Sequence, residues 1–549
     1  MDPTADSQPA STSPYRPSIP ITTEIRTHCQ IYLDEQLYVS ALALLNDLVT
    51  TGASHPDRIN RPAIAPIPFH IELVSALLIH PRYTTQAPAS ERLELASRSL
   101  TLLRNILAIL GPINARLDDA FSLEPMNATR ASRRGRNTTD YDDGSSGSDE
   151  EEPERMQGIL ANKGRLRTCA KDFWHIVGWA FNCSVKHPQR WQHWKVWLEY
   201  MLDVLEADYT ERERLDRKEH ALNPGTLDAR CEFKLLRKCM IAKYLSDVQS
   251  RSSAARRIAR SVFADGSVAS LKEFPEVYPN ETKEVKFQNG QKRKRGFTLD
   301  RSFGGYDYQD ADDPSEQPEM TDPEPESSQD DDEGNLSGQD PYLGGPESIA
   351  LRQRVLKLLS QTAADFPVEF IDYRDLYEAI YTCMRPLPVP AFSLIISPSP
   401  SSQLPIIVLI SLSQLLLLRL LPNTAPRPHT ITKRDNDELT QAVLEQCFMP
   451  FSANTSAVDD NAKVSILIES LFRIFLRSCP CYHTPDLEEA IEKGIAARED
   501  KIRGDKRRKD TAERRKEEES DRMWLTQSGE RLRCLSAWVE QKSADDDHD

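Results

Sequence analysis

Two long stretches of this sequence are too polar and too acidic to form a hydrophobic core, and they separate the rest of the chain into blocks. One has eight Asp and Glu and no Lys or Arg between Asp140 and Glu154. The other has fifteen between Ser302 and Leu351, again with no Lys or Arg. Such segments cannot bury enough apolar surface to offset chain entropy. We therefore expect disorder at 126–160 and 264–345.

The remaining sequence is long enough for two or three folded blocks, since the chain has 549 residues and domains usually have about 100–200. We expect a disordered N-terminus and an acidic tail at the two ends, and helical blocks between the polar stretches. The expected organisation is 1–19 disordered, 20–125 first block, 126–160 acidic insertion, 161–263 Trp-rich second block, 264–345 basic-then-acidic linker, 346–482 third block, 483–541 charged helix and terminal helix, and 542–549 acidic tail.

The folded blocks show helical periodicity, and strand signals are poor. Apolar residues recur every three or four positions, with Pro or Gly at the joints, which is typical of short amphipathic helices. We predict an all-α fold of irregular helical-repeat or solenoid-like blocks. The helices that we expect are 25–33 and 37–49 as an antiparallel pair, 69–79, one from Ser90 to Gly111, 188–205, 230–263, 349–359, 373–383, 406–421, 439–448, 464–476, one from Thr484 to about Trp524, and a final short one with Leu532, Leu535 and Trp538.

One apolar segment could be mistaken for a membrane span. It lies between Pro405 and Pro422 and contains Gln414 and Arg419. It is shorter than the roughly 20 apolar residues that a span needs. We therefore predict a buried core helix and no membrane association. The N-terminus lacks a signal-peptide pattern, and the ten Cys show no spaced framework, so we expect reduced thiols.

The net charge of -16 hides a basic remainder. The two acidic runs and the last five residues together carry 27 carboxylates without Lys or Arg, so the rest of the chain has a net charge of +11. Short basic clusters are typical of nuclear localisation signals. Two are present, Lys292, Arg293, Lys294 and Arg295, and Lys506, Arg507, Arg508 and Lys509. We predict a nuclear protein, although the second cluster could be the polar side of a helix.

Known catalytic motifs are missing from the sequence. It has no Gly-rich phosphate loop, no His-Glu-x-x-His and no Gly-x-Ser-x-Gly. The best metal candidate is Cys479, Cys481 and His483, but zinc needs four ligands and no second cluster accompanies them. Cysteines packed at a helix end are the simpler interpretation. We predict no enzymatic activity, no cofactor, no metal and no small-molecule substrate.

Five of the seven tryptophans fall between 174 and 197. The segment from Pro188 to Leu205 places Trp191 and Trp194 on one apolar helix face with Trp197 at its edge. A core helix is the simplest interpretation. Two alternatives remain: an exposed groove for a partner peptide that uses these rings and Arg190, or a surface that stacks nucleic-acid bases.

A basic stripe follows on the helix expected at 230–263. Its members are Arg237, Lys238, Lys243, Arg256, Arg257 and Arg260. Such a stripe is commonly a solvated face, but it could contact phosphates or another acidic partner. The acidic stretches also contain four candidate phosphorylation sites before runs of Asp and Glu, namely Ser146, Ser148, Ser327 and Ser328.

These observations favour a non-enzymatic nuclear scaffold or adaptor that binds other protein subunits in a multi-subunit complex. The alternative is a chromatin, DNA-repair or RNA-associated protein that binds nucleic acid through its basic helical faces. An enzyme of unrecognised type is a third possibility, which only a cavity with converging polar groups could support.

Overall fold

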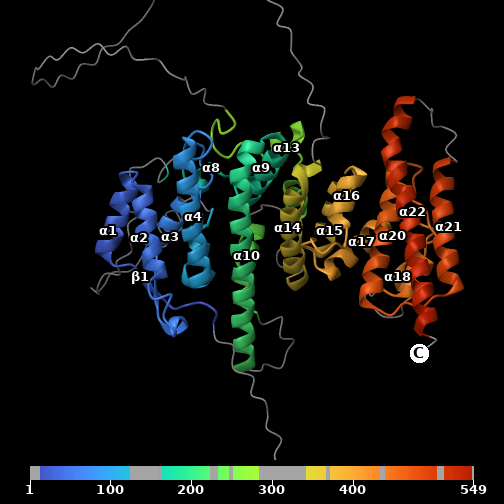
Figure 1. Cartoon of the computed structure of the whole chain (residues 1–549), viewed down its shortest axis with the longest axis horizontal. Helices are drawn as coiled ribbons and strands as arrows, with labels where there is room; N and C mark the ends of the chain where they lie inside the picture. The colour runs from blue at the N-terminus through green and yellow to red at the C-terminus, as the bar shows by residue number, and fades with distance from the viewer. Residues whose placement is uncertain are drawn as a thin grey trace, which may run out of the picture. The chain divides into compact units, whose positions relative to one another are not determined.

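The computed structural model describes residues 13–123, 160, 164–222, 233–246, 251–283, 342–366, 371–431, 439–503 and 512–546. Within these ranges the regular elements are helices apart from one short parallel pairing, between β1 (Ser18–Pro20) and β2 (Ala63–Ala65). The prediction of an all-α fold is confirmed (Figure 1). Most of the two acidic stretches lies outside the described residues.

The first block forms the expected antiparallel pair and a longer third partner. Helix α2 packs against both α1 and α4. Pro68 at the first position of α3 supplies no N–H where a helix needs none. The elements are α1 (Thr23–Asp34), α2 (Tyr38–Thr50), η1 (Arg58–Asn60), α3 (Pro68–Leu77), η2 (Pro81–Tyr83), α4 (Ala89–Ile109), α5 (Gly111–Asn114) and α6 (Leu117–Ala120).

The second block is built around one long helix, α10, which continues well beyond the segment expected at 188–205. Asp172 caps the N-terminus of α9, where its carboxylate accepts a hydrogen bond from the His175 amide at 2.8 Å. The elements are α8 (Leu166–Cys169), α9 (Phe173–Lys186), α10 (Pro188–Leu222), η5 (Leu236–Lys238), α11 (Met240–Ser246), α12 (Arg251–Val262) and α13 (Val268–Glu273).

The prediction of a single helix at 230–263 is wrong. Cys239 has an extended backbone, with ψ 154°, between η5 and α11. Two carboxylates of α10 accept the amides on either side of this break: Asp216 accepts from the Leu236 amide and Asp208 from the Met240 amide, both at 2.7 Å. Side chains from another helix thus replace hydrogen bonds that a continuous helix would make internally.

The third block and the C-terminal segment after it contain the expected helices with shifted ends. One exception is the C-terminal region, where α21 ends at Arg503 and both Trp524 and Leu532 lie on a single helix, α22, instead of on two helices. The elements are η6 (Tyr342–Gly344), α14 (Gly345–Asp365), α15 (Tyr373–Met384), α16 (Val389–Ile396), α17 (Ile406–Leu420), α18 (Pro428–Ile431), α19 (Gln441–Val443), the π-helical turn η7 (Leu444–Phe448), α20 (Val458–Ser478), α21 (Pro485–Arg503) and α22 (Ala512–Asp546).

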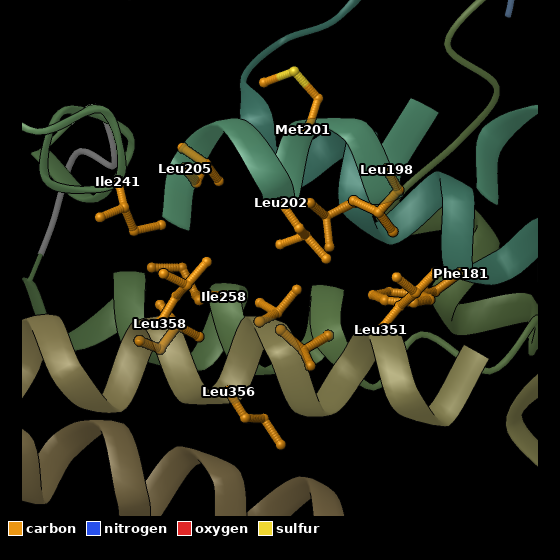
Figure 2. Close-up of a cluster of buried hydrophobic side chains, with 14 of the residues drawn as sticks. Phe181, Leu198, Met201, Leu202, Leu205, Ile241, Ile258, Leu351, Leu356 and Leu358 are labelled. Carbon is orange, nitrogen blue, oxygen red and sulfur yellow. The ribbon is translucent and has the colours of Figure 1, made fainter. Parts of the chain in front are cut away.

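The three blocks share one buried apolar cluster that extends from Ile21 to Val539 in sequence. Figure 2 shows part of it, with Leu202 and Leu205 of α10 directed toward the helices that carry Ile258 and Leu358, whereas Met201 points to the other side of α10. Helix α10 packs against α5 of the first block and against α14 of the third. The described parts of the blocks are therefore held together by burial of common surface.

The prediction of a disordered linker from residue 264 is wrong for 264–283, because these residues are packed against other described elements. Ser267 caps α13, and Phe274 and Tyr278 are buried. The carboxylate of Glu281 is buried. Its Oε1 accepts hydrogen bonds from the indole N–H groups of Trp179 and Trp194, both at 2.6 Å. These contacts attach the segment to α9 and α10.

Arg190 completes this buried arrangement. Its Nε lies 3.1 Å from Glu281 Oε1. Its remaining donors reach the first block, with Nη1 2.7 Å from Thr84 Oγ1 and Nη2 2.5 Å from the Ile79 carbonyl oxygen. One ion pair thus joins three separate stretches of the sequence.

Helix α17 is only partly a core helix. Leu409, Leu412 and Leu416 are buried, but Ile407 is 77% exposed and Leu418 is also exposed. The prediction of a buried core helix is wrong for that face. Within the described ranges, no helix is both long enough and apolar enough to cross a membrane.

We expect Glu281→Gln to lower the free energy of unfolding by about 3–5 kcal/mol, because it leaves the buried Arg190 guanidinium without its counter-charge. Urea unfolding followed by Trp fluorescence measures this. Glu347→Gln is the matched control, since its carboxylate is exposed in an ion pair with Lys195 and such pairs contribute little. Similar unfolding midpoints for the two variants would contradict the structural role of Glu281.

We also expect Gly494→Ala to destabilise the chain by about 3 kcal/mol, because a Cβ there would lie 1.7 Å from the Met449 carbonyl oxygen. Gly529→Ala is the control: its Cβ would meet Ile495 at an ordinary 3.6 Å, and Ala favours a helix over Gly by up to about 1 kcal/mol. Thermal unfolding should shift in opposite directions, and a neutral Gly494→Ala would show that α21 does not approach η7 this closely.

Candidate partner-binding cavity

The tryptophan helix faces the chain's own core. Trp191 is 8%, Trp194 0% and Trp197 1% exposed, and Arg190 is buried with them. The core interpretation describes all four side chains, because neighbouring helices and the 274–283 segment enclose them. They offer no free surface for a partner peptide or for nucleic-acid bases.

The basic stripe is spread over separate elements, and part of its charge is neutralised. Arg237, Lys238 and Arg256 are exposed. Arg257 pairs with Asp172 at 2.6 Å, and Arg260 pairs with Glu273 through two hydrogen bonds of 2.7 and 2.8 Å.

Other predicted sites fall outside the described residues and stay predictions: Lys292–Arg295, Lys506–Lys509, Ser146, Ser148, Ser327 and Ser328. Cys479, Cys481 and His483 are described, and Cys479 is exposed with a free thiol. Within the described ranges, no group of three or more His, Cys, Asp and Glu is arranged to hold a metal ion.

A cavity of about 510 Å³ lies where α12 and α13 meet η6 and the α15–α16 joint. We call it the α13 cavity. Its size falls within the usual range of ligand pockets, roughly 300–1,000 Å³. Exposed Asp265, Ser267 and Ala269 on its lining connect it with solvent. The wall is mainly apolar and is formed by Val185, Phe263, Ala264, Phe274, Tyr342, Leu343, Pro386, Leu387, Pro388 and Ala391.

The turn between α12 and α13 forms one wall of this cavity, and the residue types in the turn favour its conformation. Gly266 has φ +72°, a left-handed conformation that favours glycine. The Asp265 carboxylate accepts a hydrogen bond from the Ser267 amide at 3.0 Å, and the Ser267 side chain caps α13. On the opposite wall, Pro386 and Pro388 separate α15 from α16.

Arg352 supports the cavity from the core. It is completely buried, and its guanidinium donates to the carbonyl oxygens of Val262 and Ala264, the second at 2.9 Å. These are carbonyls at the C-terminal end of α12, where a cation is favourable. Burial lowers the pKa of Arg352 to about 9, and the Asp265 charge acts in the opposite direction. Arg352 is thus a fixed cation that orders the turn after α12.

The titratable groups on the lining do not form a reactive set. The charges of Arg260 and Glu273 satisfy each other. Burial raises the pKa of the Cys383 thiol to about 11, so at neutral pH it is protonated and a poor nucleophile. The chemistry that this lining supports is burial of apolar groups beside a polar rim.

Comparison with models of known protein families finds no match, and comparison with curated proteins finds no related sequence.

Sequence reasoning missed this cavity because half of its wall lies in the stretch assigned to a disordered linker. Phe274, Val277 and Tyr278 were the available signal: three apolar residues follow a Ser267 cap, just before the sequence becomes strongly charged. The other wall comes from residues more than a hundred positions later, and a single sequence does not show that the two meet.

We expect the rate of Cys383 alkylation by iodoacetamide to rise about tenfold per pH unit between pH 8 and 10, because the thiolate is the nucleophile. Peptide mass spectrometry measures it, and the fully buried Cys447 should stay unmodified in the folded protein. A rate that levels off near pH 8.5 would contradict the raised pKa, and failure to react at any pH would show that the cavity is closed.

Proposed function

We propose that the chain is a non-enzymatic nuclear scaffold or adaptor subunit, and that a partner protein inserts apolar side chains into the α13 cavity. The observation that carries this proposal is an open, mainly apolar cavity of about 510 Å³. Protein interfaces concentrate their binding energy in a few side chains that fill such pockets.

The cavity suits an anchor side chain. Tyr342 is a partly exposed aromatic ring on the lining, whereas Phe263 and Phe274 are buried behind the wall and give it shape. Fixed elements hold the walls, since Phe274 is completely buried on one side and Ala391 on the other. A preformed cavity lowers the entropic cost of binding because few groups must be ordered.

The nuclear assignment rests on the sequence. Lys292–Arg295 is a cluster of four basic residues, and the acidic runs contain Ser residues in acid-directed kinase contexts. Phosphorylation would add a charge of about -1.5 to -2 at each site. These features accompany many proteins that act in nuclear complexes, and they support a role in assembly.

Nucleic-acid binding through the basic stripe is the weaker candidate. Arg257 and Arg260 already pair with Asp172 and Glu273. Binding to nucleic acid depends on Lys and Arg side chains that displace counterions from the phosphates. Arg257 and Arg260 would first have to break their intrachain ion pairs.

We expect Ala269→Phe to reduce partner recovery at least tenfold, because the new ring enters the cavity from an exposed helix position. The measurement is quantitative mass spectrometry after affinity purification of the full chain. The matched control is Ala496→Phe, the same change at an exposed position of α21. A partner that copurifies stoichiometrically with the wild type and the control but not with Ala269→Phe supports the proposal. Equal recovery of every partner by all three proteins overturns the assignment to this cavity.

A further inference from the structure

A second, smaller cavity contains a buried arginine whose charge is balanced by no group among the described residues. It has a volume of about 40 Å³ and lies between α20, α21 and α22, with Arg498, Ser465, Gly529 and Leu525 on its lining. Arg498 is only 1% exposed. This cavity shares no lining residue with the α13 cavity, so binding at one site does not require binding at the other.

The guanidinium of Arg498 uses only one of its nitrogens for hydrogen bonds. Its Nη1 donates to the carbonyl oxygens of Met449 and Phe451, at 3.3 and 3.1 Å. Its Nε is buried without a partner, and its Nη2 makes no hydrogen bond to a described residue. Nε and Nη2 form the edge with which arginine binds anions through two parallel hydrogen bonds.

No carboxylate in the described part of the chain compensates this charge directly. Burial alone lowers the pKa of Arg498 to about 10, so the group is still charged at neutral pH. Leaving a buried charge unpaired costs several kcal/mol, and an unsatisfied buried donor adds to this cost. Arg190 avoids this penalty by pairing with Glu281, whereas Arg352 is also buried but donates to two carbonyl oxygens through both of its terminal nitrogens.

We propose that this cavity binds one small monovalent anion of the size of chloride, held by the Nε and Nη2 edge of Arg498. A cavity needs roughly 10–15 Å³ of water-accessible volume to hold one water, and this cavity exceeds that volume, so a single halide fits. The ion supplies the missing counter-charge inside the C-terminal helices.

The remaining charged groups on the lining are engaged nearer to solvent. Glu499 accepts a hydrogen bond from Arg503 at 3.0 Å. Arg533 pairs with Glu492 at 2.6 Å. The hydrogen bond with Glu492 is the main cause of the raised pKa of Arg533, and the charge of the exposed Glu530 adds to it. Ser465 donates its hydroxyl to Ser528 at 3.0 Å. Arg498 is therefore the one fully buried cation among the residues that line the cavity.

The test compares sodium chloride with sodium gluconate at constant ionic strength, using the full chain. We expect chloride to raise the unfolding temperature of the wild type saturably and gluconate to have no such effect, because a ligand that binds only the folded state stabilises it by mass action. Arg498→Met should remove the difference. Arg503→Met, at an exposed position of the same helix, should keep it.

Chlorine-35 NMR line broadening measures binding directly, and it does not depend on equal stability of the variants. We expect excess broadening with the wild type and with Arg503→Met, and loss of it with Arg498→Met. If Arg498→Met does not fold, Arg498→Lys retains the charge without the paired donors and should weaken chloride binding at least tenfold. Identical stability in the two salts, or broadening that is unchanged in the Arg498 variants, overturns the proposal and leaves water as the occupant.

Discussion

The enclosed carboxylate of Glu281 is the interaction on which the described part of this chain most depends. Two indole N–H groups and the Tyr278 amide donate to it, and Arg190 balances its charge. Because Arg190 also donates to Thr84 and to the Ile79 carbonyl, the first block, α10 and the segment after α13 are fixed by one group of hydrogen bonds. Removing one partner from this buried group would lower the stability of the fold, because the remaining charges or donors would be left unpaired.

Buried arginines recur as caps for helix ends. Arg352 donates to carbonyls at the end of α12, and Arg498 donates to those after η7. Each replaces the water that would solvate orphan carbonyls at a surface. These contacts show how a helix such as α12 can end inside the protein. It also makes charge balance a recurring requirement, which Glu281 meets for Arg190.

Periodicity predicted the helices that have one clear apolar face. The pair at 25–33 and 37–49, the helix at 373–383 and the helix at 406–421 all appear within a few residues of the expected ends. Prediction failed where side chains from other elements decide the backbone. Asp208 and Asp216 interrupt the helix expected at 230–263, and contacts to Trp179 and Trp194 order a stretch whose composition resembled a linker. The α13 cavity was missed for the same reason, because its walls come from distant parts of the sequence.

The common core has a consequence for the role of the polar insertions in folding. Residues on both sides of 124–159 and of 284–341 contribute to one apolar cluster, so the buried contacts do not require an unbroken chain at those two places. A protein cut within either segment would persist as a noncovalent complex whose fragments are individually incomplete. Its stability would then depend on concentration, as in an obligate oligomer.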